Sequence, residues 1–177
     1  MNTKGKILDA TAELILEEGV SNVTLAKIAK KAAVSKGGLL YHYHTKEALF
    51  QELNFAAIRE FEEAMARHLA EQNGKGAFTR AYALATLEDI KKEGSPRSTA
   101  LISIFSDYPE IMAVWQEGYT RWQQRFEQDG LTWEAAATIR FVCDGLWFNE
   151  VAGTMRVSDF AADLLHKLLA RIDKEEE

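Results

Sequence analysis

Five lysines and two histidines lie between Gly19 and Lys46, in a stretch that contains no aspartate or glutamate. Residues 1–47 carry seven lysines and five acidic residues, a net charge of +2. Residues 48–177 carry fourteen basic and twenty-two acidic residues, or −8, so the whole chain is acidic at −6. A local basic surface on an acidic protein indicates a polyanionic partner. The alternative is that the lysines only solvate an exposed pair of helices.

Two short helices joined by a three-residue turn are predicted inside this basic stretch. Thr24 can cap a helix over 25–31, and Ser35 can cap another over 36–43, because their hydroxyls accept from free backbone amides. This is the arrangement of a helix-turn-helix, whose second helix enters the major groove of DNA. The residues expected to contact DNA lie on the second helix or at helix starts: Thr24, Ser35, Lys36, Gly37, Gly38, Tyr41, His42, Thr45 and Lys46.

Each of these residue types has a chemical use at a DNA surface. Lys36 has the reach for a guanine edge or a phosphate. Thr24 and Thr45 can offer their hydroxyls and nearby backbone amides to phosphates. Gly37 and Gly38 each cost about 1 kcal/mol in a helix relative to alanine, which is understandable where a helix must approach bases or sugars closely.

The order of these residues closely resembles the DNA-binding segment of the TetR family of bacterial repressors. The resemblance is carried by Val34-Ser35-Lys36-Gly37, Tyr41-His42-Tyr43 and Thr45-Lys46-Glu47-Ala48-Leu49, preceded by Ala10, Leu14, Gly19 and Thr24-Leu25-Ala26-Lys27-Ile28-Ala29. It covers roughly residues 3–50. It implies an all-α fold in which an N-terminal three-helix DNA-binding domain is joined by a long helix to a larger helical domain for effector binding and dimerisation.

Two departures from the family pattern stand out. Ala33 occupies a turn position where the family usually has glycine. If that position needs a positive φ, the alanine carries a strain of about 1 kcal/mol. The family also often has Tyr where Leu40 stands and Phe-Pro where Tyr43-His44 stand. Losing one hydroxyl at position 40 puts more of the expected DNA contact on Tyr41 and His42.

About nine helices are expected in all. Besides the two of the helix-turn-helix, caps, glycines and prolines predict helices over about 3–18, 45–72, 77–92, 96–107, 109–130, 133–155 and 158–177. Because the charge balance changes near residue 47, we expect a DNA-binding domain over 1–47 and an effector-binding and dimerisation domain over 48–177. The long fourth helix crosses that boundary.

Aromatic residues recur at helical spacing in the larger domain. Such stripes are usually core packing, but the family resemblance implies an effector enclosed by these helices. The expected lining consists of Trp115, Tyr119, Trp122, Phe141, Asp144, Trp147 and Phe148. The aromatic lining would suit a flat aromatic effector, and Asp144 or Glu150 would favour a cationic one, unless each is a structural or surface carboxylate.

The last two helices carry a broad apolar stripe and small residues that permit close approach. The residues expected at a dimer interface are Gly145, Ala152, Gly153, Phe160, Leu164, Leu165, Leu168 and Leu169. The alternative is that the apolar faces of both helices are buried within one chain. The resemblance implies instead a four-helix bundle across a two-fold axis.

Other classes of function have little support. Cys143 is the single cysteine and has no histidine nearby in sequence, and the i, i+2 pair His42 and His44 diverges on a helix. We therefore expect no enzyme, no metal and no cofactor. No apolar run follows the first lysines and none approaches about 18 residues, so we expect no signal peptide, no membrane partner and a cytoplasmic protein that joins the nucleoid when bound to DNA.

Residues and resemblance together predict a homodimeric transcription regulator. It would bind pseudo-palindromic, double-stranded operator DNA and be released by a small-molecule effector. One alternative is a ligand-independent DNA-binding protein of the same fold. A less favoured one is a helical protein-interaction adaptor, which specific and salt-sensitive DNA binding would exclude.

Overall fold

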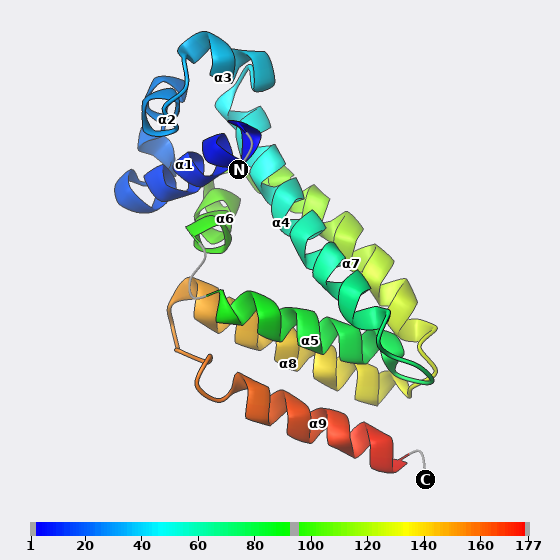
Figure 1. Cartoon of the computed structure of the whole chain (residues 1–177). Helices are drawn as coiled ribbons and strands as arrows, with labels where there is room; N and C mark the ends of the chain where they lie inside the picture. Colours follow the sequence, from blue (N-terminus) through cyan, green and yellow to red (C-terminus); the bar gives the residue numbers. More distant parts are fainter. Residues whose placement is uncertain (1–2, 93–95, 176–177) are drawn as a thin grey trace. The chain divides into compact units, whose positions relative to one another are not determined.

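A computed structural model describes residues 3–92 and 96–175, and within them the chain is all-α (Figure 1). Nine α-helices and two short 3₁₀ helices occur in the described residues, and no strand does. Their bounds are α1 (Thr3–Glu18), η1 (Val20–Asn22), α2 (Leu25–Lys31), α3 (Lys36–His42), α4 (Lys46–Leu69), α5 (Ala77–Lys91), α6 (Pro96–Asp107), η2 (Pro109–Ile111), α7 (Met112–Glu127), α8 (Trp133–Ala152) and α9 (Ala161–Glu175). The predicted all-α fold class is confirmed.

The largest differences from the expected bounds lie at helix ends. A 3₁₀ turn at Pro109 precedes α7, and α9 begins at Ala161 rather than 158. Gly153 ends α8 because its φ of 65° is left-handed, and its amide bonds back to Glu150. This is the C-terminal cap that glycine favours, so Gly153 serves the backbone of its own chain.

The described residues divide into two compact units, one from 1–58 and 95–116 and the other from 59–94 and 117–177. In the first unit, α1, α2, α3, the start of α4 and α6 surround one apolar core. Leu101 and Ile104 of α6 are fully buried in that core, and Arg97 Nη2 lies 2.7 Å from Asp9 Oδ1 of α1. The packing unit therefore extends beyond residue 47, where the basic motif ends.

In the second unit, α5 and α8 pack side by side and α9 lies against both (Figure 1). The carboxylate of Asp129 accepts from the amides of Phe78 and Thr79 at 2.8 and 2.7 Å, and this fixes the start of α5 from the α7–α8 loop. Cys143 of α8 is fully buried, and burial raises the pKa of its thiol to about 12.

Candidate nucleic-acid interface and effector site

The predicted hydroxyl caps of the helix-turn-helix are present. Thr24 Oγ1 accepts from the amide of Lys27 at 3.3 Å, and Ser35 Oγ accepts from the amide of Gly38 at 2.9 Å. Thr45 Oγ1 accepts from the amide of Ala48 at 3.1 Å at the start of α4. These bonds define where α2, α3 and α4 begin.

The outer side of α3 is open to solvent. Tyr41 is 82% exposed, and Lys36 and Gly37 are exposed as well, whereas Leu39 is fully buried and holds α3 to the core. A Cβ added at Gly37 would meet nothing within 4 Å. His42 is half-buried, and its ring lies edge-on to Tyr41 with the centroids 5.1 Å apart. An extended surface could therefore approach α3 closely. It would contact the backbone at Gly37 and the side chain of Tyr41.

Two of the five lysines of the basic stretch are engaged by α1. Lys27 Nζ lies 2.6 Å from Glu18, and Lys31 Nζ lies 2.7 Å from Glu17, which raises the pKa of Lys31. The sequence did not indicate these ion pairs, because both glutamates precede Gly19 and so lie outside the acid-free stretch. Lys36 is exposed on α3, and Lys46 lies over the Tyr108 ring at 5.8 Å from its centroid.

The turn between α2 and α3 requires a left-handed residue. Ala33 has φ 54°, the one positive φ among the non-glycine residues that the structure describes. This positive φ meets the condition stated above, under which alanine in place of the family's usual glycine carries backbone strain. L-residues tolerate this region poorly because Cβ crowds the neighbouring carbonyl.

The predicted aromatic lining is divided rather than continuous. Trp115 belongs to the first unit, where its Nε1 donates to Asn54 Oδ1 at 2.8 Å and its ring packs against Phe105. Trp122 belongs to the second unit, is 3% exposed, and contacts the Tyr119 ring at 5.1 Å between centroids. This corrects the expectation of one stripe facing one cavity.

Three further aromatic residues of α8 also lie apart from Trp122. Phe141 and Phe148 are 62% and 52% exposed, so their rings point outward from the second unit. Trp147 donates through Nε1 to Asp89 Oδ2 at 2.8 Å. Helical spacing could not tell which aromatic residues of α8 point inward and which point outward, because α8 is apolar on more than one side.

Both carboxylates that were expected to attract a cation have protein partners. Tyr82 donates to Asp144 Oδ1 at 2.6 Å, and Arg140 Nε lies 3.7 Å from Asp144 Oδ2. Burial raises the pKa of Asp144, and Tyr82 and Arg140 oppose that rise. Glu150 Oε2 accepts from the amides of Val157 and Ser158 at 2.7 and 3.1 Å, in the connection to α9. Glu150 is therefore a structural carboxylate.

A groove of about 450 Å³ lies between α4, α5 and α7 of the second unit. Its apolar lining includes Met65, Leu69, Phe78 and Trp122. Its charged residues are Glu62, Arg121 and Arg125. Of these residues the sequence predicted only Trp122. Its three charged residues went unnoticed because single charges on α4 and α7 resemble ordinary surface residues.

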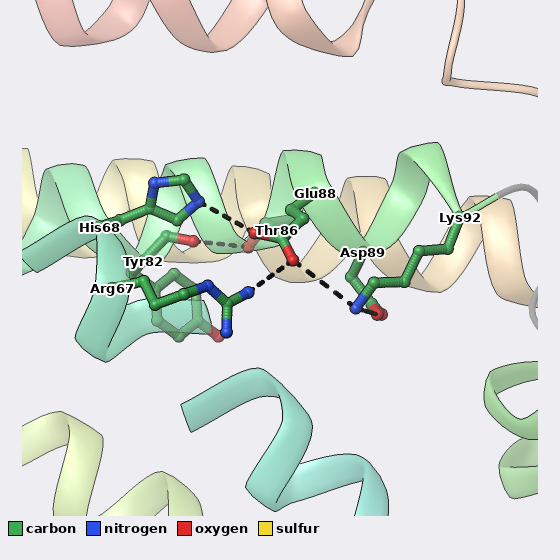
Figure 2. A network of polar contacts seen from close by, with 7 residues as sticks. All are labelled: Arg67, His68, Tyr82, Thr86, Glu88, Asp89 and Lys92. Carbon is green, nitrogen blue, oxygen red and sulfur yellow. Dashed lines mark hydrogen bonds and ion pairs between the residues drawn. The ribbon is translucent and has the colours of Figure 1, made fainter. Parts of the chain in front are cut away.

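A polar network fixes the last turn of α4 to α5, as Figure 2 shows. Arg67 Nη2 donates to Glu88 Oε1 at 2.7 Å, and His68 Nε2 lies 3.2 Å from Glu88 Oε2. One turn further along the chain, Lys92 Nζ lies 3.5 Å from Asp89 Oδ1. The end of α4 beside the groove is thereby held in place.

The residues predicted at a dimer interface fall into two groups. Leu165 and Leu169 are buried within the chain, where α9 packs on α5 and α8. Leu164, Leu168, Gly145 and Ala152 are half-buried, and Phe160 is exposed. A Cβ at Gly145 would meet nothing within 4 Å. The second group, with the outward rings of α8, forms an apolar surface that the described residues leave uncovered.

Two further features bear on classes of function. Among residues 3–92 and 96–175, no group of three or more His, Cys, Asp or Glu side chains is arranged to hold a metal ion. Within the same residues, no helix combines the length and the apolar composition needed to cross a bilayer.

Comparison with protein families gives two matches. Residues 7–53 match the model described as "Bacterial regulatory proteins, tetR family", and residues 76–173 match "Tetracyclin repressor-like, C-terminal domain". Together the two matches cover the helix-turn-helix and most of the second unit.

Individual relatives agree with these matches. The chain is 31% identical to the HTH-type transcriptional regulator QacR of Staphylococcus aureus over 64% of its own length and 60% of that protein's. It spans about half of the length of the first two curated relatives, 60% of QacR and 46% of the regulator BetI of Burkholderia thailandensis.

Solved structures share the fold at low identity. A TetR-family transcriptional regulator from Haemophilus influenzae has a TM-score of 0.67 at 14% identity, covering 97% of this chain and 94% of that one. A complex of SmeT with triclosan has a TM-score of 0.64 at 18% identity, covering 96% and 90%.

Proposed function

We propose, from the premise that this chain belongs to the TetR family of bacterial regulatory proteins, that it is a homodimeric transcriptional repressor released by a small molecule. It would bind a pseudo-palindromic operator and act by binding rather than by catalysis. Its place would be the cytoplasm, on the nucleoid when bound to DNA.

The observation that carries this proposal is the outer side of α3. Tyr41 is 82% exposed, beside exposed Lys36 and the open space at Gly37. Such a surface suits entry into a major groove, where the tyrosine hydroxyl and the lysine can meet base edges and phosphates. Thr24, Ser35 and Thr45 at the helix starts, Gly38 and His42 on α3, and Lys46 would complete the contact.

The proposed dimer places two copies of α3 on successive turns of DNA. Half-sites of such dimers lie about 34 Å apart, one helical turn, so affinity depends on the spacing of the two helices. The uncovered apolar surface of Phe148, Gly145 and Leu168 supports a partner of the same kind. An isologous contact of α8 and α9 would join the copies.

Release by a ligand would be a population shift. A small molecule that binds better to a dimer with mismatched α3 spacing lowers DNA affinity by that difference in affinity. The SmeT structure contains triclosan, which supports ligand binding within this fold. Of the residues predicted to line an effector site, Trp122 remains a proposed effector residue, because it lines the groove of the second unit.

The test is selection of binding sites from random duplex DNA by the full chain, followed by titration in salt. The proposal expects an inverted repeat, two protomers bound, and affinity that falls steeply with salt. Recovery of no enriched site, or enrichment without symmetry, would contradict it. A second candidate, a ligand-independent regulator of the same fold, would keep the DNA site and lose every small-molecule effect.

A further inference from the structure

We propose that the groove between α4, α5 and α7 is the ligand site and that its occupant is a flat apolar molecule bearing one carboxylate. This rests on the proposed function, because it names the chemical class of the proposed effector. It reverses the charge preference that the sequence suggested.

The body of the groove is apolar and already shaped. Met65, Phe78 and Trp122 line it, and each is at most 5% exposed, so their rotamers are held by packing. The volume of about 450 Å³ falls within the range of small-molecule sites, roughly 300–1,000 Å³. An aromatic body fits such walls, because rings gain both buried area and ring–ring contact.

One negative charge at the rim is already satisfied. Glu62 Oε1 accepts from Arg121 Nη2 at 2.8 Å and from Trp122 Nε1 at 3.1 Å. A cationic ligand would compete with Arg121 for this carboxylate. Asp144 and Glu150, the other carboxylates considered, are held by Tyr82 and by the amides of Val157 and Ser158.

One positive charge at the rim lacks a carboxylate partner. The Arg125 guanidinium lies over the Phe78 ring, with Cζ 4.4 Å from the centroid. Among the residues that the structure describes, no carboxylate pairs with it. Two arginines and one glutamate thus leave the rim at +1. A guanidinium stacked on an aromatic ring keeps its outer N–H groups free for a planar carboxylate, which it binds in bidentate fashion.

The experiment is calorimetric titration of the full chain with three naphthalene probes of different charge. They are 2-naphthoate, the neutral 2-naphthamide and the cationic 2-naphthylmethylamine. We expect the naphthoate to bind at least about tenfold more tightly than the amine, because one charge-assisted pair is worth that much. No naphthoate binding at millimolar concentration, or equal binding of all three probes, would overturn the proposal.

Two variants locate the site. Arg125→Gln should weaken naphthoate binding about tenfold and leave the amide within twofold. Ala66→Phe, an exposed position that lines the groove, should block naphthoate and naphthamide alike. The control Arg156→Gln changes an exposed arginine outside the groove and should change neither constant. Unaltered naphthoate binding by Arg125→Gln and Ala66→Phe, with circular dichroism unchanged, would overturn the proposal.

Operator binding is measured separately. Charge-dependent binding in the groove supports the present inference whether or not it releases DNA. Failure to bind any operator would instead contradict the proposed function and leave the calorimetric result standing.

Discussion

The hydroxyl of Tyr82 donates to Oδ1 of Asp144 over 2.6 Å and so joins α5 to α8 inside the second unit. Burial raises the pKa of Asp144 even though Tyr82 and Arg140 both favour its ionised form. Burial also raises the pKa of Tyr119, which faces the same carboxylate, to about 12. The two tyrosines therefore stay protonated as donors, and Asp144 is the group of this cluster that titrates at lower pH.

This cluster predicts a pH dependence of stability. Because the folded pKa of Asp144 lies above the unfolded value of about 3.9, the native state binds more protons between those two values. The free energy of unfolding should fall as pH rises through that window. Asp144→Asn removes this contribution, so urea unfolding should show the variant gaining on the wild type as pH rises. A difference that is constant with pH would contradict the assignment.

The left-handed turn predicts a stabilising substitution. Ala33→Gly should raise the free energy of unfolding by about 1 kcal/mol, because glycine adopts φ 54° without the Cβ clash. Ala32→Gly is the matched control, since Ala32 has φ −72° and should lose about 0.5–1 kcal/mol. Thermal or urea unfolding measures both, and a loss of stability on Ala33→Gly would refute the strain.

Tyr41 predicts a loss of operator affinity without a loss of fold. Tyr41→Ala should cost about 1–3 kcal/mol on the selected DNA site, while the unfolding midpoint stays unchanged because the ring is 82% exposed. Fluorescence anisotropy of labelled DNA measures the affinity. Gln72→Ala, outside the helix-turn-helix, is the control, and equal losses from the two changes would remove Tyr41 from the interface.

The lysine pairs predict unequal salt effects. Lys46→Ala should reduce the slope of log affinity against log salt by about 0.9, the value for one phosphate contact. Lys27→Ala should change it less, because Glu18 already engages that ammonium at 2.6 Å. Titrations between low and physiological salt measure both slopes. If Lys27→Ala had the larger effect, the paired lysine would be the phosphate contact.

The uncovered apolar surface predicts a dimer that a single charge can break. Phe148→Glu should be tolerated within one chain, because the ring is 52% exposed, and should yield monomers by leaving an unpaired charge at the interface. Leu168→Glu should act similarly. Ala170→Glu, on the exposed polar side of α9, is the control. Sedimentation velocity measures the state, and a wild-type monomer at micromolar concentration would reject the interface.

Local signals account for what the sequence predicted well. The hydroxyls of Thr24, Ser35 and Thr45 fix helix starts through bonds that span three residues, so their roles follow from the neighbouring sequence alone. The strain at Ala33 was equally local, since a turn of fixed length sets the φ of that residue.

Long-range partners account for what the sequence missed. Trp115 bonds to Asn54 and Trp122 to Glu62, pairs that are 61 and 60 residues apart, and no periodicity indicates them. α6 joins the first unit through buried contacts with α1, which the charge boundary at residue 47 could not reveal. The charge of the groove depends on Glu62 of α4 pairing with Arg121 of α7 rather than with Arg125. That choice follows from the three-dimensional packing of the two helices.

The buried thiol makes this protein convenient for site-directed labelling. Cys143 is the single cysteine, it is fully buried, and its pKa of about 12 keeps it un-ionised at neutral pH. Alkylating reagents react with accessible thiolates, so the native chain should behave toward them as if it had no cysteine. A cysteine introduced at the exposed His44, next to α3, would therefore accept a nitroxide label at one position without prior removal of Cys143. Pulsed electron spin resonance on the labelled protein would then report the distance between two such labels in free, DNA-bound and ligand-bound samples.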